Sequence, residues 1–235
     1  MSGLVMEATG VVKDLGVGVA QIRALKGVDL ALKGGELTLL MGPSGSGKTT
    51  LLSILGCMLT PTEGTVRVRG DAIAGKNPED LAKLRRENIG FVFQSYHLFP
   101  TLSAADNVRL ALDVRGETGT DAKDKAHVAL DRVGLSSKTR NYPSQLSGGE
   151  QQRVAIARAV VGDPSVILAD EPTAALDSEN GKAIMGILAA IAKDPGRGVL
   201  VVTHDPRLVP FADRIIHIED GSIVREEAGG AAQKS

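Results

Sequence analysis

The chain has 235 residues, of which 43% are hydrophobic and 23% are charged, and this composition suits one soluble α/β domain with a smaller subdomain. Its 27 Lys and Arg residues nearly balance its 28 Asp and Glu residues, so no net basic charge attracts nucleic acid or an anionic membrane. We therefore expect no nucleic-acid partner. The one cysteine, Cys57, excludes a disulfide framework and is expected to be a small buried residue in a reducing compartment.

The sequence carries no visible signal for membrane insertion. No charged and then apolar leader opens the chain, and no apolar run approaches the roughly 18 residues that a membrane span requires. We expect a cytoplasmic location unless a membrane protein holds the chain at the membrane.

Short runs rich in apolar and β-branched residues alternate with helix-like segments along the chain. Several of these runs are apolar throughout, which predicts strands buried on both faces of a mostly parallel sheet covered by helices. The runs are ELTLLMG at 36, TVRVRG at 65, NIGFVFQ at 88, SVILAD at 165 and GVLVVTHD at 198.

A glycine-rich loop, GPSGSGKTT, separates the first of these strands from a predicted helix. It matches the pattern G-x-x-x-x-G-K-[ST], in which the backbone N–H groups and the positive helix end surround phosphates. Lys48 is expected to contact the β- and γ-phosphates, and the Thr49 hydroxyl is expected to bind Mg²⁺. A turn without a ligand would explain the glycines but not the Lys-Thr pair. The candidate nucleotide contacts are Gly42, Pro43, Ser44, Gly45, Ser46, Gly47, Lys48, Thr49 and Thr50.

Polar residues follow three of the predicted strands, at the sheet edge where α/β proteins bind their ligands. Asp170 suits the Mg²⁺ shell as an oxygen ligand, and Glu171 suits a general base that accepts a proton from the attacking water. His204 is positioned to bind the γ-phosphate or to orient that water. Gln94 offers an amide to Mg²⁺ and water. For Gln94 and His204 taken singly, a polar residue that merely ends a strand is an equally good explanation.

From about residue 95 to 160 the pattern becomes helical and richer in turns, which predicts a helical subdomain with DAKDKAHVALDRVGL as one helix. Within it lies LSGGE, in which Ser147 and Glu150 have the spacing of a helix capping box. The capping box does not explain Gly148 and Gly149, which are costly in a first helical turn unless the backbone closely approaches something. The beginning of this helix is thus a second candidate anion site.

The C-terminal third contains a predicted helix and a predicted hairpin. The helix begins at Asp177, because Ile184, Ile187, Leu188 and Ile191 fall on one stripe. The pair Asp220-Gly221 between apolar runs predicts a two-residue hairpin. We expect one domain over residues 1–225 and a flexible tail over 226–235.

The ordered set of GPSGSGKTT, Gln94, LSGGEQQR, ILADEP, AALD and His204 resembles the nucleotide-binding subunit of ATP-binding cassette (ABC) transporters over about residues 4–225. The resemblance implies a P-loop NTPase with a mostly parallel sheet core, an N-terminal antiparallel β part and a helical subdomain. It is most similar to the group of lipoprotein-releasing, macrolide-exporting and heterocyst-glycolipid-exporting ATPases.

The resemblance also implies the mode of action. Two copies would pair head to tail on MgATP, so that Ser147, Gly148 and Gly149 contact the γ-phosphate held by the other chain, and Asp177 lies at the seam. The implied activity is ATP hydrolysis that powers a separate integral-membrane permease, which Gln94 and the following residues 95–108 would face. The subunit would lie on the inner face of the cell membrane and reach a periplasmic adaptor through the permease.

One departure from the family and two alternatives remain. The family usually stacks an N-terminal aromatic ring on adenine, whereas Leu15 stands near that place here and no aromatic residue precedes Phe91. A soluble ABC-type ATPase usually joins two cassettes or carries long insertions, which this chain lacks. A P-loop kinase would not need LSGGEQQR. The transported substrate is not readable from the sequence.

Overall fold

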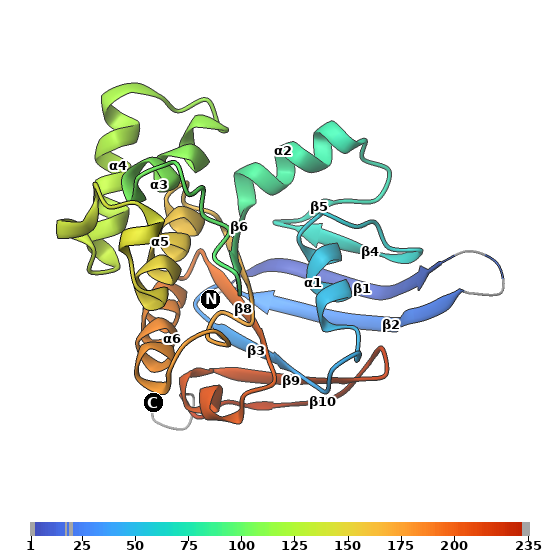
Figure 1. The fold of residues 1–235 in the computed structure, drawn as a ribbon. Coiled ribbons are helices and arrows are strands. Elements are labelled where there is room, and N and C mark those ends of the chain that lie inside the picture. The colour runs from blue at the N-terminus through green and yellow to red at the C-terminus, as the bar shows by residue number, and fades with distance from the viewer. Residues whose placement is uncertain (1–2, 17, 19–20, 232–235) are drawn as a thin grey trace.

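The computed structural model describes residues 3–16, 18 and 21–231, which form two sheets and a set of helices (Figure 1). The larger sheet has six strands in the order β10-β9-β3-β8-β7-β6. Strands β6, β7, β8, β3 and β9 are parallel to their neighbours, and β10 is antiparallel to β9. The predicted mostly parallel sheet is therefore confirmed. Its strands are β3 Leu37–Met41, β6 Ile89–Phe93, β7 Val166–Asp170, β8 Gly198–Thr203, β9 Arg214–Glu219 and β10 Ser222–Ala228.

The central strands are largely apolar because both faces of the sheet are covered. In β8, Val199 and Val201 belong to one buried cluster, whereas Leu200 and Val202 belong to the other. All four side chains are at most 1% exposed. Side chains alternate between the faces of a strand, so two covering layers favour a strand with few polar positions.

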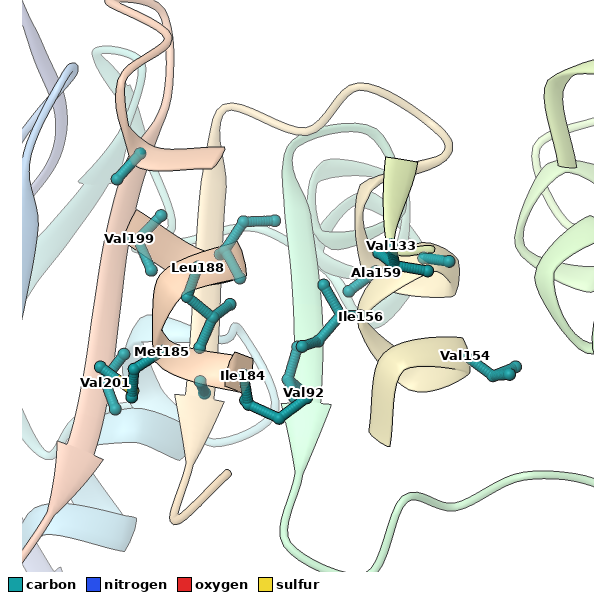
Figure 2. Close-up of a cluster of buried hydrophobic side chains, with 14 of the residues drawn as sticks. Val92, Val133, Val154, Ile156, Ala159, Ile184, Met185, Leu188, Val199 and Val201 are labelled. Carbon is teal, nitrogen blue, oxygen red and sulfur yellow. The ribbon is translucent and has the colours of Figure 1, made fainter. Parts of the chain in front are cut away.

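Helices α3 to α6 contribute to the first cluster, and α1 contributes to the second. In Figure 2, Met185 and Leu188 of α6 lie beside Val199 and Val201 of β8. Each such fully buried side chain contributes about 1.5–3 kcal/mol relative to exposure. No helix within the described residues is both long and apolar enough to span a membrane. The helices are α1 Lys48–Leu55, α2 Pro78–Asn88, α3 Ala104–Asp113, α4 Gly119–Arg132, α5 Gly148–Val160 and α6 Ser178–Ala192.

The predicted amphipathic helix and the predicted helical region are both present. Asp177 caps α6, and its carboxylate accepts hydrogen bonds from the backbone N–H groups of Glu179 and Asn180. Of the predicted stripe, Ile184 and Leu188 are buried, whereas Ile187 and Ile191 are partly buried against the same cluster.

The smaller sheet is antiparallel and has the order β2-β1-β4-β5. Its buried side chains and those of α1 fill the second cluster. Cys57, directly after α1, is 5% exposed within this cluster, which confirms its expected role as a buried core residue. The strands are β1 Leu4–Leu15, β2 Ile22–Lys33, β4 Glu63–Val68 and β5 Asp71–Ala72.

The predicted C-terminal hairpin is confirmed. The predicted flexible tail over 226–235 is wrong at its start, because residues 226–228 belong to strand β10. Asp220 and Gly221 both have positive φ, 43° and 77°, as a tight two-residue hairpin turn requires. Residues 226–228 continue β10, and the N–H groups of Gly229 and Ala231 donate to the carbonyls of Asp213 and Ala212. Pairing with β9 satisfies the backbone of this polar edge strand, which the side-chain composition alone does not reveal. Residues 232–235 lie outside the described part.

Candidate active site

Most of the predicted site residues meet in a cavity of about 770 Å³ at the carboxyl ends of the central strands. The phosphate loop follows β3, Gln94 follows β6, Asp170 ends β7 and His204 follows β8. This is the edge at which open α/β sheets bind ligands. The predicted residues that line the cavity are Pro43, Ser44, Gly45, Gly47, Lys48, Thr49, Thr50, Gln94, Asp170, Glu171 and His204.

The phosphate loop needs its glycines for reasons visible within the chain. Gly47, the N-cap of α1, has φ 99°, which L side chains rarely adopt. A Cβ on Gly42 would lie 2.0 Å from the carbonyl oxygen of Ile218, so any side chain there would displace the loop. Gly42 and the buried Ser46 therefore shape the loop without lining the cavity themselves. The N–H groups at the beginning of α1 have no partner within the helix and point toward the bound anion in such loops.

The Lys48 ammonium lies within the loop and is held by its acceptors. Its Nζ atom donates to the carbonyl oxygens of Gly42 at 2.8 Å and Pro43 at 2.7 Å. Burial lowers the pKa of Lys48, and the nearby carboxylates of Glu171 and Asp170 act in the opposite direction. A cation that is partly desolvated in this way gains from an anion placed beside it, which is what a phosphate group supplies.

The charged residues Asp170 and Lys48 both line the cavity. Burial raises the pKa of Asp170, the Glu171 carboxylate raises it further, and Lys48 lowers it. Two adjacent carboxyl groups in a partly buried site favour a cation between or beside them.

Glu171 is held on both carboxylate oxygens. Its Oε1 atom lies 2.6 Å from Nδ1 of His204, and its Oε2 atom accepts a hydrogen bond from the Thr203 hydroxyl at 3.3 Å. The Glu171 backbone has φ 45°, and its N–H donates to the carbonyl of Val202 in the neighbouring strand. Sequence analysis found Glu171 and His204 but not Thr203, although VVTHD places this hydroxyl directly before the histidine.

One end of the cavity is formed where β1 pairs with β2. Leu15 lines it as expected, with 39% of its surface exposed, and Ile22 lies opposite it in the strand pair and is 70% exposed. Arg23 and Ala24 also line this end and were not foreseen. Their contribution depends on the pairing of β1 with β2, and no local motif marks it.

The second glycine loop does not line this cavity. Ser147 forms the predicted capping box: its Oγ accepts from the N–H of Glu150 at 3.3 Å, and the Glu150 carboxylate accepts from the N–H of Ser147 at 2.8 Å. In Figure 1, α5 lies among the helices, apart from α1 and the phosphate loop. Within one chain, therefore, Ser147 cannot share a ligand with Lys48.

Gly148 and Gly149 have packing reasons that the sequence argument missed. A Cβ on Gly149 would lie 2.6 Å from Oδ1 of Asn180, and one on Gly148 would lie 2.9 Å from the Tyr96 hydroxyl. The close approach inferred from these glycines thus includes side chains of the same chain. Asn180 itself is tied to the cap of α6, because its Nδ2 donates to Asp177 at 2.7 Å.

The donor set at the cavity fits Mg²⁺. Thr49, Gln94 and Asp170 supply a hydroxyl, an amide and a carboxylate oxygen to the same space. Across the described ranges, no group of three or more His, Cys, Asp or Glu side chains is arranged to hold a metal ion by itself. Mg²⁺ does not need such a group, since it keeps several waters and usually binds one or two carboxylates together with substrate phosphates.

Comparison with known proteins identifies the family of this chain. The family model described as "ABC transporter" matches residues 25–174. The chain is 46% identical over 221 residues to the macrolide export ATP-binding/permease protein MacB 1 of Aeromonas hydrophila, covering 94% of this chain and 34% of that protein. It is 47% identical over 208 residues to the pyoverdine export ATP-binding/permease protein PvdT of Pseudomonas fluorescens, covering 88% and 32%. The chain thus spans about a third of the length of these relatives.

Solved structures give the same assignment. A dimeric, post-hydrolysis structure of the ATP-binding cassette MJ0796 bound to ADP and Pi superposes with a TM-score of 0.85 at 43% identity, covering 95% of this chain and 98% of that one. The predicted P-loop NTPase fold and the predicted resemblance to the macrolide-exporting group are confirmed. With the family model matching more than half of its length, the chain belongs to the ABC transporter family and is an ATP-binding cassette.

Proposed function

We propose that this chain binds MgATP in the cavity and hydrolyses it, that a second copy completes the site, and that hydrolysis drives an integral-membrane permease of an export or extraction system. One observation carries the proposal. A Glu171 carboxylate held by His204 at 2.6 Å lies in the same cavity as the phosphate loop and Lys48. This arrangement supports a role for Glu171 as proton acceptor beside the terminal phosphate that the phosphate loop would hold.

Each residue has a role that its position supports. Lys48 exchanges the loop carbonyls for the β- and γ-phosphates and offsets their charge. Glu171 accepts a proton from the water that attacks the γ-phosphate, and His204 orients that water and the phosphate. Thr49, Gln94 and Asp170 hold Mg²⁺, directly or through water. When bound, the cation offsets the charge that develops on the phosphate oxygens.

A second copy is needed because α5 begins outside the cavity. The N–H groups at the start of α5 and the Ser147 hydroxyl form an anion-binding helix end that this chain does not use on its own nucleotide. Ser147, Gly148 and Gly149 of one copy then face the γ-phosphate in the other, with Asp177 near the seam. The dimeric form of the related MJ0796 cassette supports this pairing.

The surface beside Gln94 supports docking of the permease. Leu98 packs against the core, as expected for that residue, whereas Phe99 is 51% exposed. Asn107, which is fully buried, fixes the turn: its amide accepts from the N–H of Phe99 and donates to the carbonyls of Phe99, Leu102 and Ser103. A rigid turn that presents an aromatic side chain to solvent is typical of a binding hot spot.

The proposed docking surface supports an expected location. With the permease bound at Phe99, the cassette lies on the inner face of the cell membrane, where ATP is available. A periplasmic adaptor would be reached only through the permease. The names of the macrolide and pyoverdine relatives support export as the direction of transport.

The assignment of Glu171 is tested by Glu171→Gln. This variant should bind MgATP and remain paired with a second copy, but hydrolyse ATP at least about 100-fold more slowly, the scale of losing a positioned base. Gel filtration with ATP and single-turnover hydrolysis measure the two effects. Glu79→Gln, an exposed change in α2 away from the cavity, is the control. Near-normal turnover by Glu171→Gln would remove Glu171 from the mechanism.

A further inference from the structure

Thr203, the last residue of β8, is the buried neighbour of the catalytic centre. Its side chain is completely inaccessible to solvent, and its strand position places it opposite Met41, the residue before the phosphate loop. The Thr203 hydroxyl makes two hydrogen bonds. It accepts from the backbone N–H of Asp205 at 3.1 Å and contacts the Glu171 carboxylate at 3.3 Å.

The direction of these hydrogen bonds follows from the groups involved. A backbone N–H can only donate, so the Thr203 oxygen must act as the acceptor toward Asp205. The single hydroxyl hydrogen is then free for Glu171, and an ionised carboxylate can only accept. The N–H of Asp205 therefore donates to the Thr203 oxygen, and the Thr203 hydroxyl in turn donates to Oε2 of the Glu171 carboxylate.

The two groups that hold Glu171 differ in their freedom to move. The His204 side chain, which contacts Oε1, is 70% exposed, whereas the Glu171 side chain is 17% exposed and Thr203 is fully buried. Thr203 is also β-branched and therefore restricted at χ1. Of the two partners of Glu171, Thr203 is therefore the more restricted by its surroundings.

We propose that Thr203 is a positioning residue for ATP hydrolysis: its hydroxyl, oriented by the N–H of Asp205, fixes the Glu171 carboxylate so that one oxygen faces the attacking water. This inference rests on the proposed role of Glu171 as general base. Thr203 is buried and does not line the cavity, so its effect should appear in the rate of the chemical step and not in ATP binding.

Thr203→Val tests the proposal, because valine keeps the shape and removes the hydroxyl. We expect kcat to fall about 10- to 100-fold, the scale of a misplaced catalytic group, with KM and MgATP affinity within about twofold of the parent. Thr203→Ser should restore at least about a third of the parent kcat. Thr38→Val is the matched control, since Thr38 is a buried threonine in the adjacent strand β3 whose hydroxyl contacts Glu36 and Arg214. Should Thr203→Val not fold, Thr203→Ala compared with Thr203→Ser makes the same test.

A double-mutant cycle with Glu171→Gln separates positioning from general damage. If Thr203 acts through Glu171, Thr203→Val should change the residual single-turnover rate of Glu171→Gln by less than about twofold, because coupled residues are non-additive. A full additional loss, or equal kcat for the serine and alanine variants, would overturn the proposal. Normal turnover by Glu171→Gln alone would instead overturn the proposed function, whereas a slow Glu171→Gln with a normal Thr203→Val would overturn only the role of Thr203.

Discussion

Ser147 has two roles to separate, a helix cap within its own chain and a phosphate ligand for a second copy, and Ser147→Ala distinguishes them. As a cap, the side chain contributes only the hydrogen bond from the N–H of Glu150 at 3.3 Å. The reciprocal bond from the Ser147 N–H to the Glu150 carboxylate, at 2.8 Å, involves the backbone and survives the substitution.

If Ser147 acts only as a cap, Ser147→Ala should lose little stability. Removing one of the two capping bonds costs about 0.5–1 kcal/mol, at the lower end for such caps. For a chain of this length, this lowers the Tm by about 1–4 °C. The hydrogen bond from the Ser147 backbone N–H lowers the pKa of Glu150, and the Ser147 side chain lowers it further. The corresponding stability is complete above the unfolded pKa of 4.5 and is lost as pH falls through the folded pKa, and only its backbone contribution is retained in the variant.

If Ser147 binds the phosphate of the other copy, Ser147→Ala should instead lose most of its rate of ATP hydrolysis. Removing one donor to the developing phosphate charge costs about 10²–10³ in kcat. Ser103→Ala is the matched control, because Ser103 caps α3 by accepting from the N–H of Asp106 at 3.1 Å. We expect both variants to lose similar stability by calorimetry, and Ser147→Ala alone to lose hydrolysis in a phosphate-release assay.

Mixed dimers extend the test to the second copy. A dimer of one Ser147→Arg chain and one Lys48→Ala chain retains one intact composite site, so the mixture should exceed either variant alone in single-turnover hydrolysis. Hydrolysis by Ser147→Ala that falls no more than that of Ser103→Ala would refute the ligand role, and an inactive mixture that still forms dimers would refute the composite site.

Leu15, Phe99 and Cys57 allow tests of adenine binding, permease docking and burial in the core, respectively. Leu15→Tyr should tighten ATP binding by about 0.5–1.5 kcal/mol in a nucleotide titration, as an added aromatic stack does, and no gain would mean that adenine lies elsewhere. Phe99→Ala should leave hydrolysis by the isolated chain unchanged but weaken co-purification with the permease, and a loss of folding would make Phe99 a core residue. Burial raises the pKa of the Cys57 thiol from 9.0 to about 11, so a thiol reagent at pH 8 should react slowly until urea unfolds the chain. Because this folded pKa is raised, the associated stability is present below pH 9.0 and is lost as pH rises toward about 11, and rapid labelling of the folded chain would contradict the burial.

Local patterns were sufficient for the parts of this molecule that depend on neighbouring residues. Strand β3, the phosphate loop and helix α1 are continuous in sequence, so their spacing alone predicted where Lys48 lies. Asp170 and His204 were found because each ends an apolar strand, and the carboxyl ends of parallel strands meet at one edge. The Asp220-Gly221 turn was also predicted from neighbouring residues alone, because this dipeptide favours the two adjacent positive φ angles of a tight hairpin turn.

Only the tertiary structure decided which distant groups touch. The Thr203 hydroxyl reaches Glu171 across two strands, Asn180 approaches Gly149 between two helices, and Ile22 joins Leu15 at the cavity through strand pairing. Such contacts depend on register and on the packing of elements far apart in the chain, which no short spacing encodes. The edge strand over residues 226–228 is a similar case, because its backbone bonds to β9 while its side chains are exposed and two of them are charged. A sequence therefore identifies the chemical groups of this site, whereas folding determines which of them hold one another in place.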